Sequence, residues 1–363
     1  MKSIVLMVGP FPPPVHGMAA VNKAVQNKLR ASGMSPEIID VAAPNIGRSL
    51  TDRLGRLPKI FRGLILLALM RRAHGAAIYM SVSGGFGKLY EILFAMLGRL
   101  RGMRIFLHHH TYIYLDRPSW IAKLLFRVAG PGALHVALCP DMAGLLKTTY
   151  RLKRVVPVSN AVFLAMSPER KKASRRNLKM LGFLSNISPD KGVFEFMNLL
   201  DQVQKVGLPL QAKLAGPFQD KKTERQVRAR LTKFSNVEYV GPKYDADKDC
   251  FFENIDVFVF PTKYEAEAEP LVIYEAMQHG LPIITYGRGC IPEIIDTKCG
   301  LVIPPDQPFA PLALEQIKKW LASPVLFESA SRAAENRFTQ ILKVNMQCCE
   351  ALKEEILDGY MNE

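Results

Sequence analysis

The sequence predicts an α/β protein with two successive doubly wound parallel sheets of the Rossmann-like kind. Short apolar runs, rich in Val, Ile and Leu, alternate along the chain with longer helical stretches, which is typical of strand–helix–strand units. A polar, basic linker over residues 168–179 interrupts this alternation, which then begins again. The chain has 363 residues, enough for two domains of ordinary size.

The first half opens with an apolar strand over residues 3–8. A loop rich in proline and glycine follows over 9–17, and a helix is expected over 19–31. The later strands of this half are predicted at 38–41, 77–82 and 105–108, and residues 155–160 end it.

The second half repeats the pattern, because each of its apolar runs is separated from the next by a stretch long enough for a helix. An amphipathic helical run from residue 333 to about 357 ends the chain. The strands of this half are predicted at 180–184, 210–215, 237–240, 257–260 and 282–285.

The net excess of basic charge is confined to the first half of the chain. Residues 1–165 hold 22 Lys and Arg against six Asp and Glu, whereas residues 166–363 hold 26 against 27. A one-sided basic domain indicates an anionic partner, such as a phosphorylated substrate, an anionic membrane face or nucleic acid.

The composition also argues against a transmembrane, secreted or disulfide-rich protein. No apolar run is long enough to cross a bilayer, and the N-terminus reads as a strand rather than a signal peptide. The six cysteines include no Cys-x-x-Cys spacing, which argues against a zinc site and a disulfide framework. We therefore expect a cytoplasmic protein.

A loop crowded with carboxylates follows the apolar run 257–260. It carries Glu265, Glu267 and Glu269 ahead of a helix that contains Glu275. Crowding carboxylates together is unfavourable, because like charges raise one another's pKa, so the acidic residues of this loop suggest a ligand that they bind. Carboxylates accept paired hydrogen bonds from vicinal hydroxyls, and amides at a helix N-terminus accept phosphate. A sugar nucleotide offers both groups; an ordinary solvated acidic loop is the alternative.

This segment resembles the paired-glutamate signature of family-4 retaining glycosyltransferases. Glu267 and Glu275 lie eight residues apart, with Pro270 between them in the expected first turn of the helix. The Gly-Phe pair that commonly follows the first glutamate is absent. Glu265 follows a tyrosine, as the family's first glutamate often does, so the first motif glutamate is either Glu267, by its spacing to Glu275, or Glu265.

The resemblance covers nearly the whole chain and implies the GT-B architecture. Two Rossmann-like domains would face a cleft, and a C-terminal helix would cross back to the first domain. The implied boundaries are 1–165 for a basic, membrane-facing acceptor domain, 166–337 for the nucleotide-sugar domain and 338–363 for the returning helix.

A second motif, residues 183–192, resembles the family's strand that ends in Gly-Arg-Leu-x-x-x-Lys-Gly. Lys191 matches the lysine that the family places on the donor diphosphate. Asn186 stands at the position of the arginine and brings no charge. The resemblance therefore implies that Lys191 stabilises the leaving diphosphate, with less help from position 186 than is usual.

The resemblance assigns the other donor contacts as well. Glu275 would bind the ribose hydroxyls, and Glu267 the hydroxyls of the transferred sugar. Glycines at strand ends let a ligand approach the backbone, although ordinary turns use glycine too. The remaining donor-binding positions, at strand ends and helix starts, are Gly17, Gly216, Gly241, Leu271 and Val272.

Three adjacent histidines, 108–110, end the fourth predicted strand of the first half. Neighbours on a strand point to alternate faces, so the run cannot chelate one metal ion as a unit. The family has a histidine at this strand end that reaches the transferred sugar. His110 is the best match, and His108, on the same face, is the alternative.

Basic and apolar residues interleave between residues 48 and 72. This composition is typical of a helix that lies on anionic lipid, while a core helix with basic flanks is the alternative for 64–70. Nucleic acid is not favoured, because no aromatic residues are arranged for base stacking among the basic ones. The expected membrane-binding residues are Arg53, Arg56, Lys59, Arg62, Arg71 and Arg72.

Together the motifs predict a retaining hexosyltransferase that uses a nucleoside-diphosphate sugar. Its acceptor would be membrane-associated, such as a polyprenyl-diphosphate-linked glycan in bacterial polysaccharide assembly, and the protein would lie peripherally on the inner face of the cell membrane. No metal or other cofactor is expected; Asp245 and Asp247 have the spacing of a metal clamp but are interpreted as solvated. A sugar-nucleotide epimerase and a noncatalytic basic binding module are the alternatives. The donor base, the sugar, the acceptor and the oligomeric state stay open.

Overall fold

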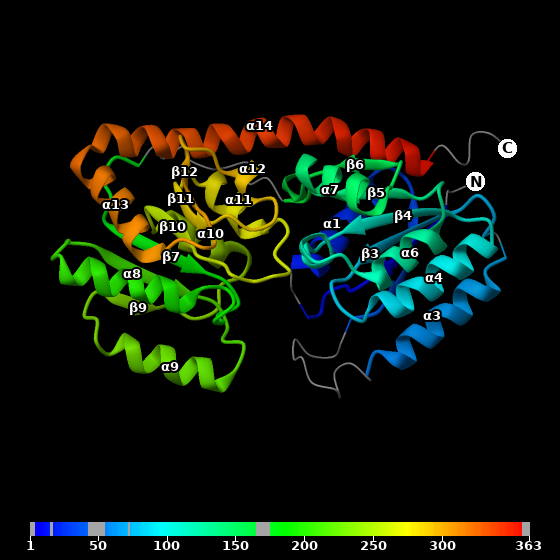
Figure 1. Cartoon of the computed structure of the whole chain (residues 1–363), viewed down its shortest axis with the longest axis horizontal. Coiled ribbons are helices and arrows are strands. Elements are labelled where there is room, and N and C mark those ends of the chain that lie inside the picture. Colours follow the sequence, from blue (N-terminus) through cyan, green and yellow to red (C-terminus); the bar gives the residue numbers. More distant parts are fainter. Residues whose placement is uncertain (1–3, 15–16, 43–54, 72, 165–174, 358–363) are drawn as a thin grey trace. The chain divides into compact units, whose positions relative to one another are not determined.

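The computed structural model of the chain describes residues 4–14, 17–42, 55–71, 73–164 and 175–357. The chain divides into two compact units, which we call the first unit (residues 1–164 and 342–363) and the second unit (residues 165–341). Within these described ranges each unit contains a six-stranded sheet, with helices between successive strands (Figure 1). All of the strand pairings are parallel, as the alternating pattern predicts.

The first unit has the strand order β2-β1-β3-β4-β5-β6. Every residue of β3 is buried, as expected for an inner strand of a parallel sheet covered on both faces. The elements of this unit are β1 (Ile4–Gly9), α1 (Gly17–Ala31), β2 (Ser35–Asp40), α3 (Leu57–Leu69), β3 (Ala77–Val82), α4 (Lys88–Leu100), β4 (Arg104–His109), α5 (Ile113–Asp116), α6 (Trp120–Ala129), β5 (Leu134–Ala137), α7 (Pro140–Tyr150), β6 (Val155–Pro157) and a 3₁₀ turn (Asn160–Phe163).

The second unit has the strand order β12-β11-β10-β7-β8-β9. One core of the second unit is a cluster of buried apolar side chains from one face of the sheet and from the helices that cover it, including Phe183, Phe196 and Trp320. The elements are β7 (Met180–Leu184), α8 (Val193–Lys205), β8 (Gln211–Ala215), α9 (Lys221–Leu231), β9 (Val237–Tyr239), α10 (Asp245–Glu253), β10 (Val257–Phe260), α11 (Leu271–Gln278), β11 (Ile283–Tyr286), α12 (Ile291–Ile294), β12 (Gly300–Ile303), α13 (Phe309–Ala322) and α14 (Pro324–Leu357).

The predicted strands are present, each within two or three residues of its expected ends, and two further strands were missed. β5 and β12 do not stand out as apolar runs, because β5 contains a histidine and β12 begins at a glycine and has only three apolar residues. Pro270 lies one residue earlier than predicted, at the N-cap of α11. Asp245 and Asp247 are exposed, but they lie in the first turn of α10 rather than in a loop.

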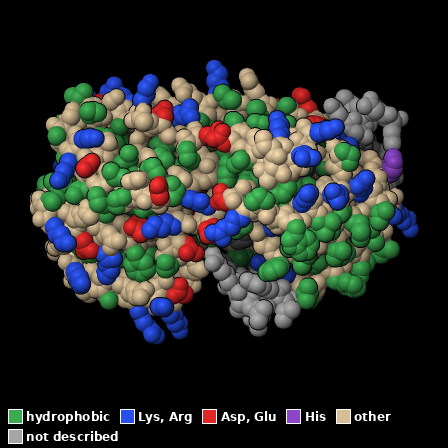
Figure 2. Space-filling view, in the orientation of Figure 1, with side chains coloured by type: hydrophobic (Ala, Val, Ile, Leu, Met, Phe, Trp, Pro, Cys, Tyr) green, Lys and Arg blue, Asp and Glu red, His purple; other side chains and the backbone are tan. Residues whose placement is uncertain are grey.

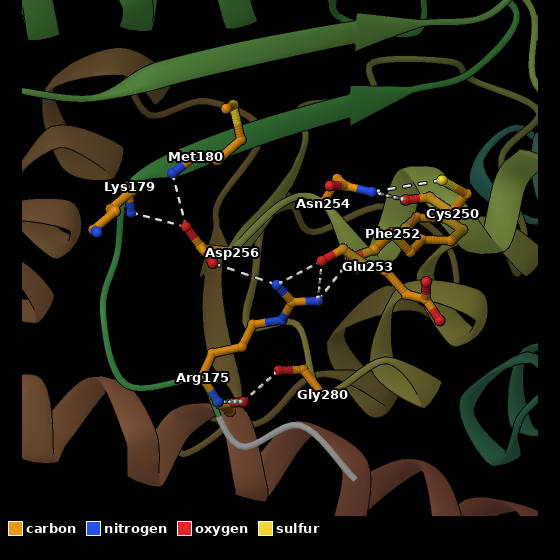
Figure 3. Close-up of polar contacts among 10 residues, drawn as sticks. Arg175, Lys179, Met180, Cys250, Phe252, Glu253, Asn254, Asp256 and Gly280 are labelled. Carbon is orange, nitrogen blue, oxygen red and sulfur yellow. Dashed lines mark hydrogen bonds and ion pairs between the residues drawn. The ribbon is translucent and has the colours of Figure 1, made fainter. Parts of the chain in front are cut away.

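The beginning of the described part of the second unit is anchored by Arg175, a half-buried arginine whose side chain is 10% exposed (Figure 3). Arg175 Nη2 donates to the carbonyl of Phe252 at 2.8 Å, near the end of α10, and its Nη1 lies 3.3 Å from Asp256 Oδ1. The other oxygen of Asp256 accepts from the amides of Lys179 and Met180, both at 2.8 Å. This network joins the beginning of β7 to the end of α10 and to the beginning of β10.

The long terminal helix α14 contributes to both units. Within the second unit, Arg337 donates to the carbonyls of Glu293 and Ile294. Residues 342–363 are grouped with the first unit, where Arg104 of β4 donates to the carbonyls of Glu355 and Ile356 at 2.6 and 2.7 Å. Of the helices in the described ranges, α14 included, none is long and apolar enough to cross a membrane.

Candidate functional site

The motif residues of the second unit lie at the carboxyl edge of its sheet. β7 and β10 are adjacent, and the strand order runs outward from them in opposite directions, through β8 to β9 and through β11 to β12. Such a switch point opens a crevice between the loops that follow the two strands, and ligands of open α/β sheets bind there. Asn186 and Lys191 follow β7, and Glu267 follows β10.

Lys191 and Glu267 form an ion pair across this switch point. The Lys191 Nζ and a carboxylate oxygen of Glu267 lie 2.6 Å apart, and the hydroxyl of Thr262 donates to the same oxygen at 3.1 Å. The Glu267 side chain is 9% exposed and that of Lys191 is 22% exposed, so the lysine is the more accessible partner. Its ammonium also lies 4.7 Å from the ring centroid of Tyr264. Two of the predicted catalytic residues are therefore brought together from positions 76 residues apart.

A glycine allows the two loops to approach closely. Gly192, the N-cap of α8, has φ of +83°, and a Cβ there would lie 1.9 Å from the carbonyl oxygen of Pro261. Beside it, the amide of Lys263 donates to the carbonyl of Asp190 at 2.7 Å. The structure thus explains why a glycine follows Lys191. Gly192 lets the loop after β7 contact the loop after β10, and this contact positions Lys191 beside Glu267.

The three glutamates of the acidic loop have different surroundings. Glu265 is exposed, and its backbone carbonyl accepts a hydrogen bond from Arg288 at 2.9 Å. Glu267 and Glu269 are buried, and Glu269 accepts from the hydroxyl of Tyr274 at 2.5 Å. Among the three, Glu267 is the one that contacts the lysine of the second motif.

Helix α11 presents the remaining motif residues. Leu271 and Val272 form its first turn, where backbone amides have no partner within the helix. Glu275 is half-buried one turn later, and Lys248 of α10 places its Nζ 2.6 Å from the Glu275 carboxylate. Lys248 was not among the predicted residues. The Lys248 and Glu275 side chains are 27 residues apart in sequence, so no local sequence pattern indicates that they form a contact.

The glycines at the ends of β8 and β9 meet each other through the backbone. The Gly216 amide donates to the Gly241 carbonyl at 2.9 Å, and a Cβ on Gly216 would lie 1.7 Å from the carbonyl oxygen of Ser185. Gly216 is therefore required by backbone packing. Gly241 has φ of +75° and open space around its Cβ position, so its conformation, rather than crowding, favours glycine there.

The histidines of the first unit alternate in direction, as a strand requires. The rings of His108 and His110 lie together, with centroids 4.0 Å apart, while His109 contacts the hydroxyl of Tyr114 at 2.6 Å and His135 at 3.0 Å. Burial lowers the pKa of His108 and of His109 well below the usual value, so both are neutral. His110 is the more accessible of the three and directly follows β4.

The other predicted residues of the first unit are more dispersed. Gly17 is exposed and begins α1, with open space around its Cβ position. Lys59 pairs with Asp40 at 2.8 Å. Arg62 and Arg71 are exposed and Arg56 is half-buried, while Arg53 and Arg72 lie outside the described residues. Across the described ranges, no three His, Cys, Asp or Glu side chains are grouped as a metal site would require.

Comparison with known proteins identifies related sequences and folds. Residues 167–339 match the family model described as glycosyl transferases group 1. A D-rhamnosyltransferase, WbpZ of Pseudomonas aeruginosa, is 32% identical over 146 residues. That alignment covers 39% of this chain and 37% of WbpZ, so the chain aligns with little more than a third of this relative.

Solved structures share the architecture at low sequence identity. Sucrose-phosphate synthase from Thermosynechococcus elongatus superposes with a TM-score of 0.72 at 15% identity, over 98% of this chain and all of that one. Anabaena HepE in complex with UDP gives 0.66 at 17% identity, over 97% of this chain and 100% of its own. A glycosyltransferase from Rickettsia africae gives 0.69 at 15% identity, over 98% and 99%. The predicted fold class, two Rossmann-like domains of the GT-B kind, is confirmed.

Proposed function

We propose that this protein is a glycosyltransferase that moves a sugar from a nucleoside-diphosphate donor to a hydroxyl acceptor. One observation carries the proposal: Lys191 and Glu267 meet at the switch point of the second sheet, within the segment that matches group 1 glycosyl transferases. A cation for a diphosphate and a carboxylate for sugar hydroxyls, side by side, suit the two adjoining parts of one nucleotide sugar.

The donor would contact three groups of the second unit. A lysine ammonium has three donors, and Lys191 keeps donors for phosphate oxygens while one is held by Glu267. The first-turn amides of α11, at Leu271 and Val272, point their partial positive charge toward the same edge. Glu275 would accept the ribose hydroxyls, which requires Lys248 to share or release that carboxylate.

Transfer would proceed with retention and without a metal ion. The acceptor oxygen attacks the anomeric carbon on the side from which the diphosphate leaves. The bond from that carbon to the phosphate oxygen breaks as the new glycosidic bond forms, and the acceptor proton passes to the leaving oxygen. Lys191 and the helix amides stabilise the negative charge that develops there. His110 and Gly17 of the first unit are proposed to contact the transferred sugar and the donor phosphates.

The acceptor is proposed to be lipid-linked, as a polyprenyl-diphosphate glycan is, and the protein to work peripherally at the inner face of the cell membrane. The excess of basic residues in the first half supports an anionic acceptor. Because WbpZ is named for D-rhamnosyl transfer and HepE binds UDP, activated rhamnose and UDP-sugars are the first donors to test.

Thermal stabilisation by UDP-, GDP- and ADP-sugars, followed by donor hydrolysis with and without lipid acceptor, tests the proposal. A donor at 100 times its Kd should stabilise the protein by about 2.7 kcal/mol. Acceptor-dependent nucleotide release that continues in EDTA is the expected result. Stabilisation without turnover would identify a binding module instead, conversion of the free sugar nucleotide an epimerase, and no stabilisation by any donor would refute the assignment.

A further inference from the structure

Three helices of the first unit expose an unusual amount of apolar surface. α3, α4 and α6 pack side by side in the order α3-α4-α6 (Figure 1). Of the 20 exposed large hydrophobic side chains in the described ranges, 11 belong to these helices of 13, 13 and 10 residues. Those that project furthest include Phe61, Leu69, Leu100 and Trp120, each between 68% and 76% exposed.

This surface is not the exposed edge of the core. The inner faces of the same helices are separately buried, through Leu67 of α3, Phe94 of α4 and Leu125 of α6. The helices are thus apolar on two sides, whereas a helix that packs against a sheet and faces water carries charge outside. α9 of the second unit follows that ordinary pattern: its exposed residues include Lys221 and Arg225. The space-filling view shows the apolar patch as one continuous area bordered by basic side chains (Figure 2).

The charge of this surface has one sign. α3, α4 and α6 expose no acidic side chain, because their one carboxylate, Glu91, is buried and accepts from the Ser83 amide. Exposed basic residues accompany the apolar ones, among them Arg62, Lys123 and Arg127. A second copy of the same face would bring like charges together, which opposes self-association. Nucleic acid would leave the aliphatic side chains without a partner.

We propose that the α3-α4-α6 face docks on an anionic lipid bilayer and inserts its apolar side chains at the level of the headgroups. Aliphatic residues enter the boundary of the acyl chains, Trp120 lies at the interface, and the basic residues contact lipid phosphates. The surface is a composite: five of its 11 exposed large hydrophobic side chains lie on α3, within the basic segment 48–72, and the other six lie on α4 and α6. Docking does not depend on the transfer chemistry of the second unit.

The contribution of the apolar side chains to lipid binding can be tested by cosedimentation. The full chain is mixed with phosphatidylcholine vesicles that contain either no phosphatidylglycerol or 30% phosphatidylglycerol. Leu93→Gln/Leu100→Gln on α4 removes two exposed side chains and should weaken binding to the anionic vesicles by tenfold or more. Val325→Gln/Leu326→Gln on α14 is the matched control, because those two side chains are also exposed on a helix, and it should bind as wild type does.

The contribution of the basic side chains to lipid binding is tested with Lys123→Gln/Arg127→Gln on α6. Lys221→Gln/Arg225→Gln on α9 is the matched control. Each basic residue near an anionic surface contributes about fivefold in partitioning, so the first pair should lose about 25-fold and the loss should shrink in high salt. Far-UV circular dichroism and thermal melting verify that each variant is folded.

Several results would overturn the proposal. The first is that wild type does not bind vesicles, or binds neutral and anionic vesicles equally well. The second is that Leu93→Gln/Leu100→Gln binds anionic vesicles as wild type does. The third is a wild-type dimer in solution that Leu93→Gln/Leu100→Gln converts to monomer, which would assign the face to a second copy. Glu275→Ala should bind vesicles like wild type, so a failure of the proposed transfer chemistry can be told apart from a failure of docking.

Discussion

Replacing Glu267 by glutamine should affect both stability and transfer, because it breaks the ion pair at the switch point without changing the size of the side chain. Lys191 then keeps its charge beside a neutral amide, and the Thr262 hydroxyl loses a charged acceptor. Breaking a fully buried pair costs about 3–5 kcal/mol, whereas exposed pairs contribute about 0–1 kcal/mol. With side chains 9% and 22% exposed, this pair lies between the two cases, and we expect a loss of about 1–3 kcal/mol.

The expected changes can be measured separately. For a unit of residues 165–341, each kcal/mol lowers the melting temperature by about 2–4 °C, so a loss of about 1–3 kcal/mol should lower the melting temperature of the variant by about 2–12 °C. Removing a contact that stabilises the transition state typically costs 10²–10³-fold in turnover, so kcat should fall by about 100-fold in a nucleotide-release assay.

Glu265→Gln is the matched control, since the exposed Glu265 side chain lies two residues away in the same loop. It should change stability by less than about 0.5 kcal/mol and leave most of the activity. A double-mutant cycle with Lys191→Met should give a coupling of more than about 1 kcal/mol. If Glu265→Gln lost more activity than Glu267→Gln, or if Glu267→Gln melted and turned over like wild type, the assignment of the first motif glutamate would be wrong.

Three further predictions concern other positions. Asn186→Arg should tighten donor binding by about 1.5–3 kcal/mol through a charge-assisted contact and leave acceptor affinity unchanged; calorimetry in which neither Asn186→Arg nor Asn186→Ala altered donor affinity would show that this position does not face the diphosphate. Gly192→Ala should lower stability by more than about 2 kcal/mol in urea unfolding, because its Cβ would overlap the Pro261 carbonyl, and a wild-type midpoint would contradict the loop contact. Burial raises the pKa of Glu91 from 4.5 to about 7, so its contribution to stability is complete below the unfolded pKa and is lost as the pH rises through 7. Wild type should therefore lose about 3 kcal/mol of stability between about pH 4.5 and pH 7, and Glu91→Gln should remove this loss; equal losses in variant and wild type would exclude Glu91 as the cause.

The strands were predictable where burial on both faces demanded a continuous apolar run, as in β1, β7 and β10. β5 and β12 were not, because His135 interrupts the apolar run of β5 and β12 begins at Gly300, whereas β10, of the same length, is apolar throughout. The exposed apolar face of α3, α4 and α6 was not predictable either. α3 reads equally well as a core helix or an interfacial one, and its burial depends on which neighbours cover it.

The two motifs, Lys191-Gly192 and the paired glutamates Glu267 and Glu275, were visible in the sequence because each is local. What each motif residue contacts was decided by the tertiary structure. Lys191 meets Glu267 because β7 and β10 are neighbours in the sheet although 76 residues separate the two side chains. Lys248 meets Glu275 because α10 and α11 flank β10. Local composition determines which segments become strands and helices, but the pairing of parallel strands brings distant loops to one edge, and only there do charges become partners.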